Sequence, residues 1–134
     1  MPVRMILVLR ALLLSTVLSA QGAELAPRLL TYKQVGSQAL QAHVFDPGPT
    51  GTTPRSAIVL FHGGGWTDGE AAWVYPAARR FAALGLVAVA IDYRLSDGKT
   101  TTPLDAMADA RDAIRWVRGR AGAVRLAPQR VAAY

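Results

Sequence analysis

Three consecutive glycines behind a buried segment are the part of this sequence best suited to chemistry. The apolar residues 57–61 are typical of a strand buried on both faces, and the segment HGGGW follows at residues 62–66. Glycine has no Cβ, so the backbone there can turn sharply and bring its N–H groups close to a ligand. Such amides can hold negative charge on a phosphate, or on the oxyanion that forms when a nucleophile attacks a carbonyl.

The phosphate alternative fits the residues poorly. The segment matches neither G-x-G-x-x-G nor the pattern G-x-x-x-x-G-K-[ST] with its lysine and hydroxyl. A tight turn with a purely structural role stays open. We therefore favour the oxyanion interpretation.

The elements around this loop indicate an α/β protein. Residues 32–35 and 40–45 have strand-like patterns on either side of Gly36, which predicts a short antiparallel pair. Residues 56–61 and 86–91 are predicted buried strands, and the helical segment 76–84 lies between them. Strand, helix and strand in this order predict a parallel sheet.

A second helix and a third parallel strand are predicted toward the end of the chain. Apolar residues recur at helical spacing from residue 103 to about residue 120, with the charged side chains, Asp109 among them, mostly outward. Residues 130–134 then have the pattern of a strand. No internal repeat or interdomain linker interrupts residues 23–134, which we interpret as part of one domain.

Four motifs in order resemble those of a known enzyme group. They are HGGGW at residues 62–66, DYRL at 92–95, the helix motif D-x-x-x-A-I-R-W at 109–116 and LAPQRV at 126–131. Together they resemble the hormone-sensitive-lipase-like and feruloyl/acetyl esterase group of the α/β-hydrolase superfamily, whose oxyanion loop follows a buried strand. The resemblance implies a partial α/β-hydrolase fold, mostly parallel, with an antiparallel pair at its start.

The resemblance also implies roles for individual residues, listed here by role. Gly63, Gly64 and Gly65 would form the oxyanion hole, Trp66 would line the substrate pocket, and His62, Asp92, Tyr93 and Arg94 would support the loop. Ordinary core packing is the alternative for Trp66. His62 comes too early in the chain to be the catalytic base, because the triad of this fold runs Ser, then Asp or Glu, then His.

The catalytic residues themselves are absent from this sequence. None of its serines lies in G-x-S-x-G, and in the family this elbow would follow residues 131–134 almost at once. We therefore expect a chain truncated before its nucleophile elbow and inactive by itself. The alternatives are a non-catalytic secreted module that pairs through its open sheet edge, and a fragment of a prolyl-oligopeptidase-like peptidase.

The N-terminus and the composition indicate where such a protein would act. Residues 1–22 combine a positive start, an apolar stretch and small residues before Ala23, which predicts a signal peptide starting at Met1 or Met5 and export to the periplasm or outside the cell. A buried first helix is the alternative. The apolar stretch is too short for a stable membrane span.

The expected partner is a small ester substrate. The net charge of +6 comes from scattered arginines rather than a basic stripe, so we expect no nucleic-acid partner. Without cysteine and with only 2 histidines, we expect no metal or other cofactor.

Overall fold

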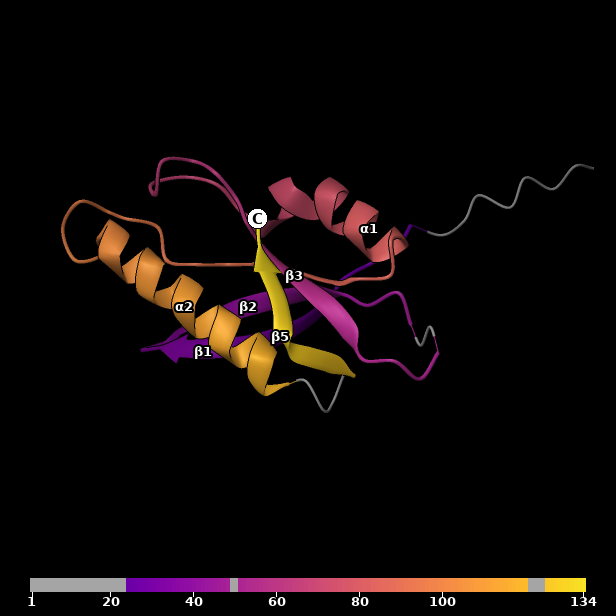
Figure 1. Cartoon of the computed structure of the whole chain (residues 1–134). Helices are drawn as coiled ribbons and strands as arrows, with labels where there is room; N and C mark the ends of the chain where they lie inside the picture. The colour runs from indigo at the N-terminus through magenta and orange to yellow at the C-terminus, as the bar shows by residue number, and fades with distance from the viewer. Residues whose placement is uncertain (1–23, 49–50, 121–124) are drawn as a thin grey trace, which may run out of the picture.

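A five-stranded sheet forms the centre of the protein, which we describe from a computed structural model covering residues 24–48, 51–120 and 125–134 (Figure 1). The strands are β1 (Arg28–Val35), β2 (Gln38–Phe45), β3 (Arg55–Phe61), β4 (Val87–Ile91) and β5 (Leu126–Ala133), in the spatial order β1-β2-β4-β3-β5. The first two pairs, β1 with β2 and β2 with β4, are antiparallel. Strand β3 pairs in parallel with β4 and with β5. This confirms the predicted partial α/β-hydrolase fold. The predicted signal peptide, residues 1–22, lies outside the described residues.

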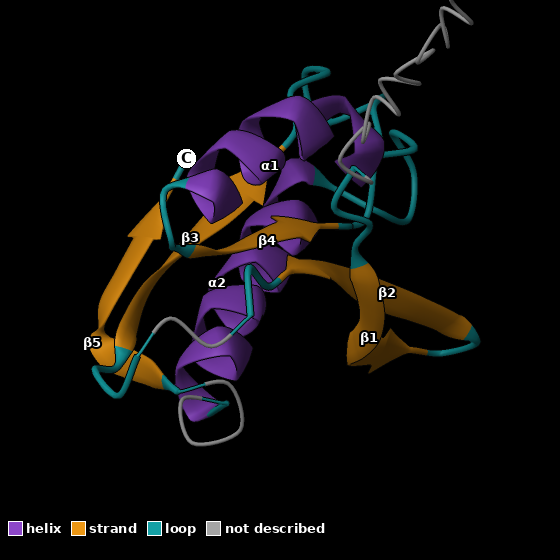
Figure 2. Cartoon of the chain, turned by 90° about the vertical axis from the view of Figure 1, so that its right-hand side faces the viewer, coloured by secondary structure: helices purple, strands orange, loops and turns teal. Residues whose placement is uncertain are grey.

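The two α-helices pack on opposite faces of the sheet (Figure 2). Helix α1 (Tyr75–Ala83), preceded by the short 3₁₀ helix η1 (Ala71–Val74), covers the face that carries Ile58 and Leu60 of β3. Helix α2 (Pro103–Gly119) covers the other face, which carries Val59 of the same strand. Side chains alternate between the two faces of a strand, so both faces of β3 are buried as its continuous apolar run predicts.

Helix α1 ends where its glycine predicts. The N–H of Gly85 donates to the carbonyl of Ala82 and the N–H of Leu86 to that of Phe81, at 2.8 and 3.2 Å. This pair of bonds closes a helix C-terminus when the residue after the cap is left-handed, and Gly85 has φ of +86°. The turn leads directly into β4.

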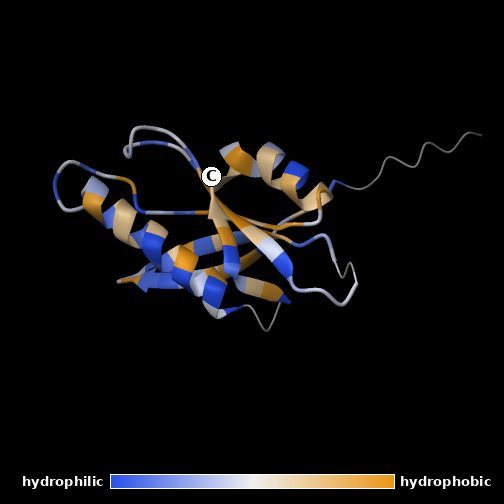
Figure 3. Ribbon diagram, in the orientation of Figure 1, coloured by the Kyte–Doolittle hydropathy of each residue, from blue (hydrophilic) through white to orange (hydrophobic). Residues whose placement is uncertain are grey.

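The buried stripe of α2 differs from the one that the apolar spacing predicts. Residues Ala106, Asp109, Ala113 and Val117 face the sheet, whereas Leu104 and Met107 are 73% and 46% exposed. Figure 3 shows polar and apolar residues alternating along this helix. The expectation that Asp109 points outward is wrong, because its carboxylate has two cationic partners below the helix. No helix in the described part of the chain is long and apolar enough to cross a membrane.

Candidate functional site

The glycine loop leaves β3 at the carboxyl edge of the parallel strands and is held by aromatic contacts. The His62 side chain, 5% exposed, stacks on the Tyr93 ring with 4.3 Å between centroids and 10° between planes. The Tyr93 hydroxyl donates to the carbonyl oxygen of His62 at 2.6 Å. Burial raises the pKa of Tyr93, so this hydroxyl keeps its proton. Tyr93, the second residue after β4, thereby fixes the first residue of the loop.

The His62 ring also fixes the next peptide group. Its Nδ1 lies 2.7 Å from the carbonyl oxygen of Gly63. A carbonyl oxygen only accepts hydrogen bonds, so we assign the proton to Nδ1. The imidazole therefore holds the carbonyl group of Gly63 in place. That His62 supports an oxyanion loop stays a prediction.

Two glycines of the loop are required by space as well as by backbone conformation. Gly64 has φ of +117°, and a Cβ built on it would lie 2.0 Å from the carbonyl oxygen of Asp68. Gly69 has φ of +109°, and its Cβ would lie 2.3 Å from Nδ1 of His62. A Cβ at Gly63 would meet nothing within 4 Å. The loop therefore has no room for a side chain at Gly64 or Gly69 but has room for one at Gly63.

The amides of the glycine run are not used to hold the loop together. The carbonyl of Gly64 accepts from the N–H groups of Thr67 and Asp68, at 3.2 and 3.1 Å. Within residues 24–48, 51–120 and 125–134, however, none of the N–H groups of Gly63, Gly64 and Gly65 donates a hydrogen bond. These three glycines are exposed, so water or a bound ligand supplies the acceptors for their N–H groups.

Trp66 lies beside a cavity rather than in the core. It is 44% exposed, has a left-handed φ of 71°, and its ring centroid lies 6.1 Å from that of Tyr93. Together with Met107 and Ala110 of α2 it lines an almost purely apolar cavity of about 290 Å³. Its carbonyl accepts from the N–H of Ser96 at 2.7 Å, which ties the glycine loop to the loop after β4.

Asp92, which follows β4, has a different set of partners from its neighbours in the DYR motif. Its Oδ2 lies 3.0 Å from Nε2 of His43, and the Nδ1 of this histidine lies 2.5 Å from the hydroxyl of Tyr75. Tyr32 donates its hydroxyl to the carbonyl of Asp92 at 2.7 Å. Burial, together with nearby carboxylates, raises the pKa of Tyr32. Asp92 therefore joins β2 and α1 at this edge of the sheet.

Arg94 binds a buried carboxylate below the loop. Its Nε and Nη2 donate to the two carboxylate oxygens of Asp109 at 2.8 and 2.9 Å, and its backbone N–H adds a third bond at 3.1 Å. Nζ of Lys33 on β1 donates to the same carboxylate at 2.7 Å. Burial alone would raise the pKa of Asp109, but the hydrogen bonds from Arg94 and Lys33 hold it below its usual value. The cluster joins β1, α2 and the loop after β4.

The structure thus brings together Gly63, Gly64, Gly65, His62, Trp66 and Tyr93, and places Asp92 and Arg94 in neighbouring support clusters. Lys33, His43 and Tyr75 were not singled out as partners from the sequence. One signal could have found the burial of Asp109, because this residue occupies the i+3 position of the stripe that runs from Ala106 to Ala113. No group of three or more potential metal ligands occurs in the described ranges.

Ser96 is a serine whose backbone N–H donates directly to the glycine loop, at the carbonyl of Trp66. Its hydroxyl already donates a hydrogen bond elsewhere. Its Oγ donates to the carbonyl of Thr101 at 2.9 Å. No histidine appears among its partners in the described part of the chain. The arrangement can therefore stabilise an anion, but these residues hold no activated nucleophile beside it.

Comparison with known proteins identifies the class. The model of the BD-FAE family matches residues 45–134, and the chain belongs to this family. Its fold is that of the α/β-hydrolase esterases, as the four motifs predict.

Among solved structures, the chain is similar to esterase 2 of the planctomycete Thermogutta terrifontis. In the native form the identity is 38% and the TM-score 0.75, over 81% of this chain and 39% of the esterase chain. In the propionate-bound form these values are 38% and 0.75, over 81% and 40%. The chain also shares 31% identity over 102 residues with the non-reducing polyketide synthase pkbA of Emericella nidulans, which is 75% of this chain and 4% of that protein. The chain therefore spans about two fifths of the esterase and a small part of the synthase.

Proposed function

We propose that these residues form the oxyanion-hole part of an exported carboxylic ester hydrolase. The N–H groups of Gly63, Gly64 and Gly65 would stabilise the negative charge that develops on the substrate carbonyl oxygen. One observation carries the proposal: these amides follow a buried parallel strand and donate to no atom within the described residues. A preorganised donor of this kind is worth about 10²–10³ in turnover.

The end of β5 lies beside the end of β3, from which the glycine loop starts. The N–H of Tyr134 donates to the carbonyl of Val59 at 2.8 Å, and the N–H of Phe61 donates to the carbonyl of Tyr134 at 2.9 Å. A turn directly after β5 would therefore lie beside the glycine loop. We propose that a longer form of the chain carries its serine on such a turn, followed by the acid and the histidine of the triad. Without them the 134 residues would hydrolyse esters only at background rate.

The proposed substrates are esters of short acyl chains. The apolar cavity of about 290 Å³ next to Trp66 and Met107 would receive a short alkyl group. The propionate-bound esterase of Thermogutta terrifontis agrees with a short acyl group. Export rests on residues 1–22, whose pattern is that of a signal peptide.

The test compares the 134-residue chain with the chain extended through the sequence encoded after Tyr134. We expect turnover of p-nitrophenyl acetate and butyrate by the extended chain alone, and its loss when the serine of the elbow is replaced by alanine. Equal turnover by both chains, or an extension without such a serine, would contradict the proposal.

The oxyanion role is measured separately on the extended chain after phosphorylation of its serine by an organophosphate. The phosphoryl oxygen then occupies the place of the oxyanion, so the amide protons of Gly64 and Gly65 should move downfield in the proton–nitrogen NMR spectrum. The amide proton of Gly69, which already donates to Asp68 at 2.7 Å, is the internal control. Unmoved signals at both glycines would reject the oxyanion hole while leaving esterase activity intact.

A second candidate is a non-catalytic module that pairs through the β5 edge. Strand β5 lies at an edge of the sheet, and large apolar side chains beside it are exposed, among them Trp73, Leu84 and Tyr134. Unpaired edges of this kind associate with other strands. Sedimentation of the 134-residue chain distinguishes the two: a stable, monodisperse dimer favours the module, whereas a monomer or a heterogeneous aggregate does not.

A further inference from the structure

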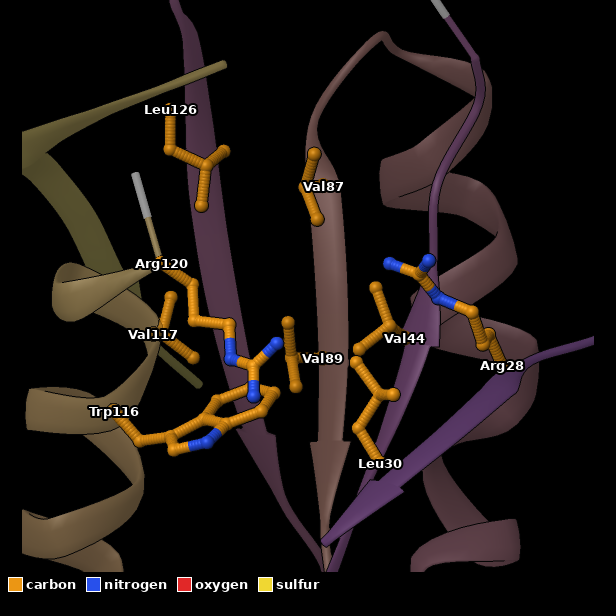
Figure 4. A pocket seen from close by; sticks show the side chains of 9 residues that line it. All are labelled: Arg28, Leu30, Val44, Val87, Val89, Trp116, Val117, Arg120 and Leu126. Carbon is orange, nitrogen blue, oxygen red and sulfur yellow. The ribbon is translucent and has the colours of Figure 1, made fainter. Parts of the chain in front are cut away.

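A second cavity lies at the opposite edge of the sheet from the glycine loop. It is bounded by Val87 at the start of β4, Leu126 at the start of β5 and Val44 near the end of β2 (Figure 4). Val87 and Leu126 are the first residues of β4 and β5, so the cavity lies at the amino edge of the parallel strands. No residue of the glycine loop lines this cavity.

The walls of this cavity are apolar and its volume suits a small ligand. The isopropyl groups of Val89 and Val117 and the ring of Trp116 form its sides. Its volume is about 120 Å³. An engineered apolar cavity of about 150 Å³ holds benzene, so a chain of four or five carbons is of the right size.

Two guanidinium groups stand at the cavity. Figure 4 shows Arg28 and Arg120 with their guanidinium groups directed inward from opposite sides. Arg120 lies over the ring of Trp116, with 4.6 Å from Cζ to the centroid. Neither arginine forms an ion pair within residues 24–48, 51–120 and 125–134. Asp46, whose pKa Arg28 helps to lower, is itself paired with Arg55 at 2.7 Å.

Apolar walls with two cations select a ligand that has an alkyl end and a negative end. A guanidinium presents parallel N–H donors that match the two oxygens of a carboxylate. We propose that this cavity is a binding site for a short aliphatic carboxylate of five or six carbons, with its chain between Val89 and Val117 and its carboxylate on Arg28 and Arg120. The site does not depend on the proposed hydrolase activity, because it shares no residue with the glycine loop.

The binding experiment uses the 134-residue chain and pentanoate as the probe, at constant ionic strength. We expect saturable shifts of the methyl NMR signals of Val89, Val117 and Leu126, with a Kd on the order of 1 mM, as is usual for so small a ligand. Acetate, 1-pentanol and pentylammonium each lack one of the two recognised features, so each should bind at least about tenfold more weakly, one decade in Kd.

Matched arginine variants locate the carboxylate. Arg120→Gln and Arg28→Gln should each raise the Kd for pentanoate at least about fivefold, since each removes a charged hydrogen-bond donor. Arg118→Gln, an exposed position on the same helix, should change it less than about twofold, and circular dichroism confirms the fold of each variant. Equal binding of 1-pentanol, an unchanged Kd in both glutamine variants, or shifts at Met107 instead of Val89 would each overturn the proposal.

Discussion

The loops that leave β3 and β4 at the same edge of the sheet use their backbone amides in opposite ways. In the loop after β4, carboxylates occupy the amides: Oδ1 of Asp97 accepts from the N–H groups of Lys99, Thr100 and Thr101, each at 2.8 Å. In the loop after β3, the amides of Gly63, Gly64 and Gly65 have no such acceptor among the described residues. The first pattern stabilises the loop itself, and the second is the arrangement on which the proposed oxyanion hole rests.

The two loops also differ in what fixes them to the body of the protein. Ionic bonds to Asp109 hold Arg94 in the loop after β4. A stacked ring and a neutral hydroxyl hold His62 in the loop after β3. The protonated hydroxyl of Tyr93 carries no negative charge that would repel an anion at the glycine amides, so this support is compatible with the proposed oxyanion hole. Substitution of Asp109 in the ionic cluster should lower the unfolding free energy most, and substitution of Gly63 should lower it least.

The largest effect is expected for Asp109→Ala. This change leaves Arg94 and Lys33 without their shared carboxylate, and breaking a buried pair costs about 3–5 kcal/mol of unfolding free energy. Urea unfolding followed by circular dichroism measures it. Asp112→Ala, which removes the more exposed partner of Lys33, should cost about 1 kcal/mol or less. Similar costs at both positions would contradict the central role of Asp109.

The next largest loss of unfolding free energy is expected at Gly64, where the glycine loop has no room for a side chain. Gly64→Ala forces an L side chain into φ of +117° and against the carbonyl oxygen of Asp68. Strain and overpacking together should lower the unfolding free energy by about 2–4 kcal/mol. The control is Gly63→Ala, where space is open and a change within about 0.5 kcal/mol is expected. Thermal unfolding of the two variants measures the difference in stability, and equal melting temperatures would argue against this loop geometry.

A smaller effect is expected for Tyr93→Phe. The ring and its stacking on His62 remain, but the buried carbonyl of His62 loses its donor at 2.6 Å. An unsatisfied buried acceptor costs about 1–3 kcal/mol. Tyr134→Phe, at an exposed side chain, is the matched control and should be neutral. If the two substitutions have the same cost, the hydroxyl of Tyr93 does not support the loop.

The smallest effect is local and depends on pH. Hydrogen bonds from the Thr100 hydroxyl and the amides of Thr101, Lys99 and Thr100 hold the pKa of Asp97 below its ordinary value of 3.8. A lowered pKa means that these bonds stabilise the folded loop above pH 3.8 and are lost as the pH falls through the lower folded value. The amide proton signals of Lys99 and Thr101 should therefore move only below that pH. Those of Gly63 and Gly65 have no carboxylate acceptor within the ranges that the structure describes and should stay constant.

Several parts of the fold and of the candidate site follow from local patterns. The apolar run before His62 predicts a strand buried on both faces, and Gly85 predicts the end of α1, because periodicity and backbone freedom act over a few residues. The start of β5 was predicted too late, at Arg130 rather than Leu126, because Pro128 and the polar residues beside it interrupt the strand pattern. The short helix η1 has no pattern long enough to be predicted.

Local sequence patterns suffice to predict the order of the main elements, the resemblance to esterases and the position of the glycine loop at a strand end. The three-dimensional fold was needed to show that the amides of Gly63, Gly64 and Gly65 have no acceptor among the described residues, that Asp109 is buried between Arg94 and Lys33, and that Arg28 and Arg120 line the same cavity. These contacts could not be predicted because they join residues that lie far apart in the sequence. Strand and helix propensities are local, whereas a hydrogen-bond partner or a buried counter-ion is supplied by residues far away in sequence, as Lys33 is for Asp109.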